Sequence, residues 1–541
     1  MAPDLFPEPQ CGMLVEKAEI VDGNLSVLTT GTEFSLNKTG NGTFKQRIGH
    51  YRPVLIMNIE PCIAEVSPQI ITNSPGRVII SHNNFNLRIN GDSLFMFQAL
   101  KLLTITVSRK FDAGFHASYK ANHVLFDEYG GFGLFYSEQE VEDEFNPYEE
   151  ITAKYTIPPN AVLWIGICPP KPYNWERSIK DNVVWHWSNQ LGYPSNTDLI
   201  SWAKEGNIIL LQSEVMLWKD WNLAFIPRLG ESEFSRVRET CHQHGLKFIV
   251  YTSPFYFLKG TPFESQSMNS FENFKGWPPG DATGRNIDLF LSEITRVMQE
   301  YKPDGFYFDG QYTDNPAPLY MLARKSRELL GENAILEWHS TWALGNGQCF
   351  FPQADAYVDF ILRGEGQNML YKDFNYLRYF VSCYNTSNSI GVLCTNGPDK
   401  PDADTIDRLL QANCRLHTIV GWLQNKDMMN LLKTHYRYKL TPDLRKEIEQ
   451  LADKRQKEIP NIAKKRAEEM NILLHEPSWK ESIFTEEFNS IPNCKSSISP
   501  LNENPFLVQN GIMSISALPH TYAYFTCPLD KIIQGFIVRF K

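Results

Sequence analysis

The stretch between residues 180 and 423 constrains the fold most, because short apolar runs alternate along it with amphipathic helical segments. Such alternation predicts an α/β fold with a parallel sheet. Eight candidate strands match a (β/α)8 TIM barrel, which typically takes about 250 residues. A doubly wound open sheet is the rival, but no glycine-rich phosphate loop follows the first candidate strand.

The expected strands are 183–187, 208–213, 248–253, 305–308, 335–338, 357–362, 390–394 and 417–421. The expected helices between them are 196–204, 231–244, 286–300, 319–330, 371–383 and 404–416. The remaining parts of the chain have different patterns. We predict an N-terminal β-sandwich over 1–175, a catalytic barrel over 176–425, a charged helical segment over 426–480 and a small C-terminal β-domain over 481–541.

The composition narrows the choice of partners. A formal charge of −10, with no dense Lys/Arg patch, argues against a nucleic-acid partner. No apolar run approaches the roughly 20 residues of a membrane-spanning helix. Ten cysteines without Cys-x-x-Cys spacing predict neither a zinc site nor a dense disulfide framework, and we expect no cofactor.

Localisation and oligomeric state are less constrained. The first residues lack the basic and apolar regions of a signal peptide. We therefore expect a cytoplasmic protein, or a secreted or periplasmic one whose leader was removed. Aromatic residues make up 13% of the chain, which suits a protein that binds carbohydrate but also many other enzymes. The oligomeric state stays open.

Two acidic residues stand at predicted strand tips. Asp309 ends the fourth strand and is followed by glycine, and Glu365 follows the sixth. Catalytic groups of α/β barrels lie at this end of the strands. The alternatives without a catalytic role are a turn-forming Asp-Gly pair at Asp309 and a surface salt bridge between Arg363 and Glu365. In the functional interpretation, Arg363 shares the strand face of Glu365 and tunes its charge or binds a substrate hydroxyl.

A pair of carboxylates on alternate strands suits glycoside hydrolysis. One stays ionised and attacks the anomeric carbon, and the other starts protonated and assists the leaving oxygen. A separation of about 5–5.5 Å would suit a retaining enzyme. This chemistry makes Asp309 the candidate nucleophile and Glu365 the candidate acid/base.

Residues 180–423 resemble the catalytic barrel of retaining exo-glycosidases, most closely the α-galactosidase clan and its α-glucosidase relatives. The matching segments are Lys302-Pro-Asp-Gly-Phe-Tyr-Phe-Asp309 and Arg363-Gly-Glu365, and the first is also similar to the nucleophile strand of α-L-fucosidases. The resemblance implies a nucleophile at Asp309 and an acid/base at Glu365. It also implies a substrate-binding Glu-Trp pair on the fifth strand, so that Glu337, Trp338 or His339 would line the substrate pocket. The chain departs from these families where it has Glu instead of Asp as acid/base and lacks the Lys-x-Asp and Trp-x-Asp-Met-Asn motifs.

Further candidates lie at the same end of the predicted barrel, the carboxyl ends of its strands, which we call the mouth. Glu337 and His339 share one face of the fifth strand and Trp338 takes the other, so Glu337 competes with Glu365 for the acid/base role. The remaining candidate substrate-binding residues offer carboxylates for hydroxyls and flat rings for sugar faces, although structural packing is the commoner role of any one tryptophan. They are Glu214, Trp218, Trp221, Tyr312 and His186.

The sequence therefore favours a retaining glycoside hydrolase, exo-acting on an oligosaccharide or polysaccharide. The first alternative is a non-catalytic carbohydrate-binding barrel, which has no reason to hold two carboxylates across one mouth. The second is a metal-assisted barrel hydrolase, in which His186, His339 and Glu365 would converge on one ion. The fold alone cannot choose among them, because barrels host many chemistries.

Overall fold

The computed structural model describes most of residues 11–474 and four short strands between 495 and 526. Within the first range it omits 62–67, 111–113, 120–121, 137–140, 147–149, 188–192, 213–225, 255–284, 311–315, 340–349 and 396–399. The chain divides into two compact units, Met1–Ala463 and Lys464–Lys541. The domain boundaries expected from the sequence stay predictions.

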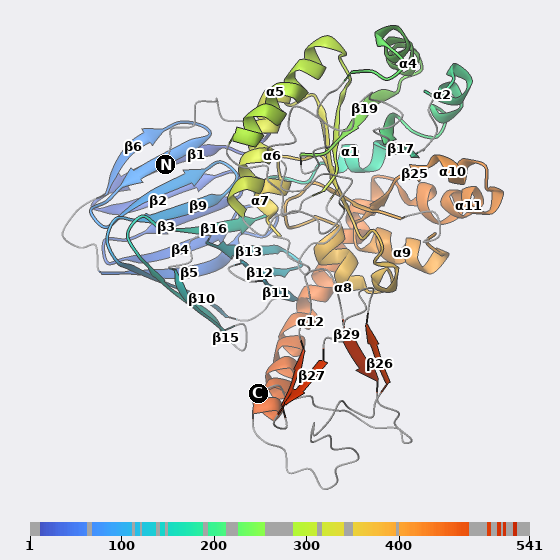
Figure 1. Ribbon diagram of the computed structural model, residues 1–541. Helices are drawn as coiled ribbons and strands as arrows, with labels where there is room; N and C mark the ends of the chain where they lie inside the picture. Colours follow the sequence, from blue (N-terminus) through green and yellow to red (C-terminus); the bar gives the residue numbers. More distant parts are fainter. Residues whose placement is uncertain are drawn as a thin grey trace. The chain divides into compact units, whose positions relative to one another are not determined.

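The first unit begins with two antiparallel eight-stranded sheets, stacked as a sandwich (Figure 1). In order across the first sheet, the strands are β1 (Val15–Val21), β2 (Asn24–Thr29), β3 (Thr32–Leu36), β4 (Asn41–Gln46), β5 (Arg52–Glu60), β10 (Leu103–Lys110), β15 (Glu150–Ile157) and β14 (Glu142–Asn146). In the second they are β11 (Phe115–Tyr119), β12 (Asn122–Asp127), β13 (Gly130–Phe135), β16 (Val162–Cys168), β9 (Leu94–Ala99), β8 (Phe85–Asn90), β7 (Arg77–Ser81) and β6 (Gln69–Asn73).

Alternation of side chains explains the sandwich core. Every second residue of β10 is buried while its neighbours are half-buried, as expected of a strand with one face against a core. Phe34 and Phe44 from the first sheet meet Phe95 of the second, with ring centroids 5.1 and 4.9 Å away. The two sheets therefore form a β-sandwich.

The second part of this unit is a nearly closed parallel barrel. Its strands run in chain order through β17 (Val183–Trp187), β18 (Ile208–Gln212), β19 (Lys247–Thr252), β20 (Gly305–Phe308), β21 (Ile335–His339), β22 (Phe360–Arg363), β23 (Ile390–Leu393), β24 (Arg415–Leu416) and β25 (Thr418–Ile419). β24 pairs with β23 and β25 pairs with β17, so residues 415–419 link the two ends of the sheet. Strands β20 to β23 are buried along their whole length, which is typical of parallel strands covered on both faces.

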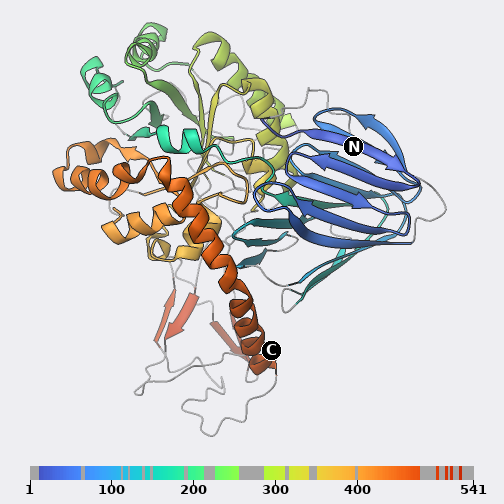
Figure 2. The same cartoon turned by 180° about the vertical axis from the view of Figure 1, so that it is seen from behind.

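Helices alternate with the barrel strands along the chain and also follow the last of them. They are α1 (Trp175–Lys180), α2 (Asn196–Trp202), α4 (Glu231–Gln243), α5 (Arg285–Glu300), α6 (Pro316–Leu330), α7 (Pro352–Asp355), α8 (Phe374–Tyr376), α9 (Ala403–Gln411), α10 (Val420–Leu423), α11 (Lys426–Leu431) and α12 (Asp443–Leu474). The buried stripe of α5 includes Phe290, whose ring lies 5.2 Å from that of Phe308 on β20. Helices α9 to α11, in orange, lie together when the molecule is seen from behind (Figure 2).

The structure corrects the predicted elements near the seventh and eighth strands. The helix expected over 404–416 ends at Gln411, and Arg415–Leu416 form strand β24. The Arg415 guanidinium donates to the Ser178 carbonyl oxygen at 2.6 Å, and backbone pairing with β23 holds the segment extended. The segment expected as a strand over 417–421 turns into α10 at Val420. Tertiary contacts therefore override the local helical pattern here.

Two other segments also differ from expectation. The sixth strand begins at Phe360, three residues later than expected, because Ala356 and Tyr357 finish the short turn that begins with α7. The helix expected over 371–383 is a short α8 followed by a π-helical turn, Leu377–Val381.

In the second unit, β26 (Lys495–Ile498) pairs with β29 (Ala523–Thr526), and β27 (Phe506–Gln509) pairs with β28 (Ile512–Ile515). Among the described residues, no helix is both long enough and apolar enough to cross a bilayer.

Candidate active site

Asp309 lies at the carboxyl end of β20, where the strand's alternation continues by one residue. Phe308 faces outward against α5, whereas Tyr307 and Asp309 face inward. The Tyr251 hydroxyl at the end of β19 donates to Asp309 Oδ2 at 2.8 Å. The backbone N–H of Asp309 bonds to the Thr252 carbonyl oxygen at 2.8 Å, which fixes the strand tip against β19. The carboxylate is held in place and remains 18% exposed.

His339 connects Asp309 to Glu365. It ends β21, and its Nδ1 lies 3.0 Å from Asp309 Oδ1. Its Nε2 lies 3.4 Å from Glu365 Oε2, within ion-pair distance. Since one imidazole contacts both carboxylates, their facing oxygens are closer than about 10 Å, the outer limit for the two acids of a glycosidase. The ring is only 4% exposed, so it lies beneath the two carboxylates.

Glu365 reaches this cluster because of the glycines on each side of it. Gly364 and Gly366 have φ angles of +98° and +68°, in the left-handed region that favours glycine. Gly364 breaks the alternation of β22, so that Arg363 and Glu365 point in different directions. The Arg363 guanidinium is buried and bonds to Asp355 Oδ2 at 2.5 Å and to the Phe380 carbonyl oxygen at 2.7 Å. The expectation that Arg363 shares a face with Glu365, and its alternative of a surface salt bridge between them, are both wrong.

The charges around His339 favour its protonated form. Burial lowers the pKa of His339, but Cys394, the hydrogen bond with Asp309 and the charge of Glu365 raise it, and the net pKa lies well above its usual range. Burial and the nearby Asp309 raise the pKa of Tyr307, which therefore stays neutral. Burial raises the pKa of the Cys394 thiol, whereas its charge interaction and hydrogen bond with His339 lower it, and the net pKa is raised. An imidazolium between two carboxylates is the charge arrangement that results.

Glu337 lies one layer below this cluster. Its side chain is fully buried, and its Oε1 lies 2.8 Å from Nε2 of His417, the residue between β24 and β25. Its Oε2 has no hydrogen-bond partner among the described residues. His339 and Glu337 do share a face of β21, as expected, but only His339 reaches the mouth.

Trp338 and His186 point away from the barrel interior. The Trp338 indole N–H donates to the Gly310 carbonyl oxygen, and its ring packs on Phe308 with centroids 5.8 Å apart. The His186 ring lies 4.9 Å from the ring of Trp202 on α2. The structure therefore does not bring His186 together with His339 and Glu365. Four other candidates, Glu214, Trp218, Trp221 and Tyr312, lie outside the described residues.

Sequence reasoning missed two members of the cluster, Tyr251 and Cys394. Tyr251 is paired in register with Tyr307, and Cys394 directly follows β23. The available signal was their position at the carboxyl ends of strands already predicted.

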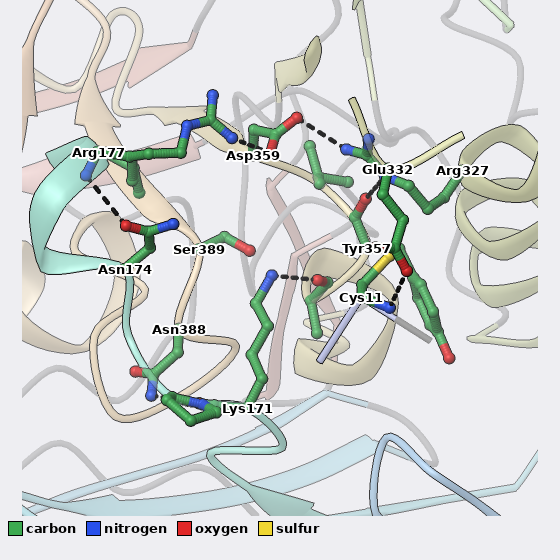
Figure 3. A pocket seen from close by; sticks show the side chains of 14 residues that line it. Cys11, Lys171, Asn174, Arg177, Arg327, Glu332, Tyr357, Asp359, Asn388 and Ser389 are labelled. Carbon is green, nitrogen blue, oxygen red and sulfur yellow. Dashed lines mark hydrogen bonds and ion pairs between the residues drawn. The ribbon is translucent and has the colours of Figure 1, made fainter. Parts of the chain in front are cut away.

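A cavity of about 290 Å³ lies at the opposite, amino-terminal ends of β22 and β23 (Figure 3). Its polar lining is dominated by Lys171, Arg177, Arg327 and Asp359. Asp359 Oδ1 lies 2.5 Å from Arg177, and its Oδ2 lies 2.8 Å from Arg327. The Lys171 ammonium points into the cavity and donates to the Ala356 carbonyl oxygen. Catalytic groups of such barrels lie at the other end of the strands, so this cavity is not the candidate active site.

Comparisons with known proteins give structural neighbours only. No protein-family model matches the chain, and no curated protein matches it. The structural neighbours are glycoside hydrolases of families GH36 and GH31. The GH36 α-galactosidase of Geobacillus stearothermophilus is 8% identical over 78% of this chain and 86% of its own, with a TM-score of 0.42.

Two GH31 enzymes are similar at comparable levels. The sulfoquinovosidase from E. rectale is 11% identical over 94% of this chain and 97% of its own, with a TM-score of 0.37. The dextranase of Flavobacterium johnsoniae is 9% identical over 82% of this chain and 70% of its own, with a TM-score of 0.38. At such low identities and TM-scores, function has to be inferred from the residues of the mouth themselves.

Proposed function

We propose that this chain is a glycoside hydrolase whose barrel is of the (β/α)8 type, with Asp309 as nucleophile and Glu365 as acid/base. One observation carries the proposal: two carboxylates from the tips of the alternate strands β20 and β22 contact the same imidazole. Both are partly exposed at the barrel end where catalytic groups of this fold lie.

The reaction follows the two-step retaining route. Asp309 attacks the anomeric carbon as the bond to the leaving oxygen breaks, and Glu365 gives its proton to that oxygen. Glu365 then takes a proton from water, whose oxygen attacks the anomeric carbon and releases Asp309. The Tyr251 hydroxyl bonds to Asp309 Oδ2 and His339 bonds to its Oδ1, so the carboxylate is held in one orientation for attack. We extend the proposal to exo action on an oligosaccharide or polysaccharide, on the strength of the sequence resemblance.

A panel of aryl glycosides tests this function, because an activated leaving group makes even slow turnover visible. We expect release of the aryl group from at least one sugar, and a first-formed product with the anomeric configuration of the substrate in proton NMR. Asp309→Asn keeps the shape of the side chain but removes the nucleophile, so it should lower kcat/KM by at least about 10³-fold.

Melting curves of the Asp309→Asn variant provide the folding control. A folded variant with wild-type rates would remove Asp309 from the mechanism. An inverted product would show that Asp309 activates water instead of forming a covalent bond. No turnover across the panel would contradict the glycosidase function itself.

A further inference from the structure

His339 occupies a position that the two-step route leaves unexplained, between the nucleophile and the acid/base. We propose that His339 and Glu365 share a single proton, with His339 acting as the positioning residue that holds it until Glu365 delivers it. This inference rests on the proposed function, because it assigns Glu365 the acid/base role.

The first step of the argument is which ring nitrogen carries a fixed hydrogen. An ionised carboxylate can only accept hydrogen bonds. With Asp309 ionised, as a nucleophile must be, the 3.0 Å contact requires hydrogen on Nδ1. The tautomer is thereby assigned, and Nε2 is the nitrogen whose protonation can change.

The second step is where the Nε2 proton can go. Nε2 lies 3.4 Å from Glu365 Oε2, so one proton placed between them belongs either to an imidazolium or to a carboxylic acid. Both forms have the same total charge, and the proton can therefore cross without any change in the net charge of the cluster. Catalytic contacts of this kind often shorten when substrate binds.

The third step concerns the groups that face the ring. Asp309 and Tyr307 face it from β20, Glu365 from the end of β22 and Cys394 from the end of β23. Burial raises the pKa of Tyr307, which stays neutral at pH 7. Burial lowers the pKa of His339, but among the described residues Cys394, the hydrogen bond with Asp309 and the charge of Glu365 together raise it further, so the ring keeps its proton at neutral pH.

The fourth step follows the proton through the reaction. In the first half, the pair gives its proton to the leaving oxygen, and neutral imidazole and ionised Glu365 remain. At the same time Asp309 becomes an ester and loses its charge, so the ring loses one of its two counter-charges. Glu365 is then ready to act as a base toward water, and the water proton restores the shared state. The pair thus alternates between one shared proton and none.

This arrangement has a measurable consequence. The acid form is lost at a pH that belongs to the coupled pair and not to a lone carboxyl group. Burial lowers the pKa of the imidazole, but the contacts of His339 with Asp309 and Glu365 help to raise it, so the ring holds the proton to higher pH than an ordinary histidine. A purely structural histidine would hold the carboxylates in place without affecting the pH at which activity falls.

Two substitutions separate the contacts of the ring. In His339→Asn the amide nitrogen can replace Nδ1 toward Asp309, and in His339→Gln it can replace Nε2 toward Glu365, but neither side chain titrates. In both variants, we expect the pH at which kcat/KM falls on the alkaline side of its pH profile to be lower by at least about one pH unit. The loss should be about 10²–10⁴-fold on a glycoside with a poor leaving group and under tenfold on an activated aryl glycoside.

The kinetic outcomes decide between roles. An unchanged alkaline side of the pH profile in both folded variants would overturn the proposal. Equal losses for good and poor leaving groups at every pH would do the same, since they would indicate positioning of Asp309 alone. Asp309→Asn serves as the contrast, because its kcat/KM should fall by the same factor for good and poor leaving groups. Melting curves exclude variants that fail to fold.

A second measurement does not depend on activity, and so separates failure of this inference from failure of the proposed function. In ¹⁵N NMR of labelled histidines, the His339 signals are identified by their absence in His339→Asn. We expect Nδ1 to stay protonated while Nε2 titrates above pH 7, and the titration to move to lower pH in Glu365→Gln and in Asp309→Asn. A ring that titrates at the same pH in all three proteins would overturn the proposal even if the enzyme is an active glycosidase.

Discussion

The two ends of strand β22 hold carboxylates in opposite circumstances. Asp359 precedes the strand and is bound by Arg177 at 2.5 Å, by Arg327 at 2.8 Å and by the backbone N–H of Leu336 at 2.8 Å. Glu365 follows the strand, is 36% exposed, and contacts His339 at 3.4 Å. The two residues are six positions apart in the chain and lie at opposite ends of the barrel.

The difference lies in what kind of cation faces each carboxylate. Arginine is always charged, so Asp359 faces two permanent positive charges and has no reason to take up a proton. Although burial raises the pKa of Asp359, Arg327 and Arg177 lower it below its usual range. Histidine can exchange a proton, so Glu365 faces a partner that can give one up. The comparison distinguishes a carboxylate neutralised by two arginines at one end from the two carboxylates proposed as catalytic at the other.

Glu365→Ala, at the carboxyl-terminal end of β22, should produce the largest loss of activity. An acid/base is needed most when the leaving group is poor, so we expect losses of about 10²–10⁴-fold on unactivated glycosides and smaller ones on activated aryl glycosides. Azide should restore turnover in this variant, because it attacks the glycosyl-enzyme without a general base. Detection of the glycosyl azide by mass spectrometry checks the result.

Glu337→Ala is the matched variant for that experiment. Glu337 is buried beneath the mouth and paired with His417, so we expect loss of stability and no azide effect. Azide rescue in Glu337→Ala and not in Glu365→Ala would move the acid/base to β21 and contradict the comparison of the two ends of β22.

Asp359→Asn should destabilise the fold at the amino-terminal end of β22. Removing one partner of a buried ion pair leaves uncompensated charge, and the expected loss of unfolding free energy is roughly 3–5 kcal/mol. Because the pKa of Asp359 is lowered on folding, its stabilisation is present above the pKa of the unfolded chain and is lost as pH falls through the folded value. The stability gap between wild type and variant should therefore narrow in acid, as measured by urea unfolding from pH 7 to pH 3.

The exposed Glu176→Gln on α1 is the control for Asp359→Asn, and we expect it to leave the free energy of unfolding unchanged at every pH. Folded Asp359→Asn should keep wild-type kcat/KM. A severe loss of activity in the folded variant, with little loss of stability, would show that the two ends of β22 do not differ in the way inferred.

Lys171→Met should produce the smallest effect, and in the opposite direction. Burial lowers the pKa of Lys171 to about 8, so the charged ammonium is less favourable in the folded chain than in the unfolded one. This cost is present below pH 8 and is relieved as pH rises from 8 toward the unfolded value of about 10.4. We expect the variant to be more stable by on the order of 1 kcal/mol at pH 7, with the gain vanishing by about pH 10.

The control for Lys171→Met is Lys180→Met, which removes an exposed lysine paired with Glu176. It should show no gain and no such pH dependence in thermal melts. A destabilised Lys171→Met would mean that the ammonium at the amino-terminal cavity contributes to the fold instead of opposing it.

The sequence by itself determined the existence and order of most barrel elements. Strands β17, β20 and β23 begin where the apolar runs predicted them, and Asp309 stands at the tip of its strand because β20 keeps its alternation through that residue. These features are local. The period of apolar residues reports which face of an element is buried, and a residue at the end of a parallel strand lies at a known edge of the sheet.

Only the tertiary structure decided which side chains meet. Alternation alone placed Arg363 and Glu365 on one face, and the positive φ of Gly364 separated them. Alternation also placed Glu337 and His339 on one face of β21. Their different depths in the barrel left Glu337 in contact with His417 and brought His339 into contact with Asp309 and Glu365. Strand register, a single glycine dihedral and the closure of the barrel through residues 415–419 are set by contacts between distant segments, and no local pattern encodes them.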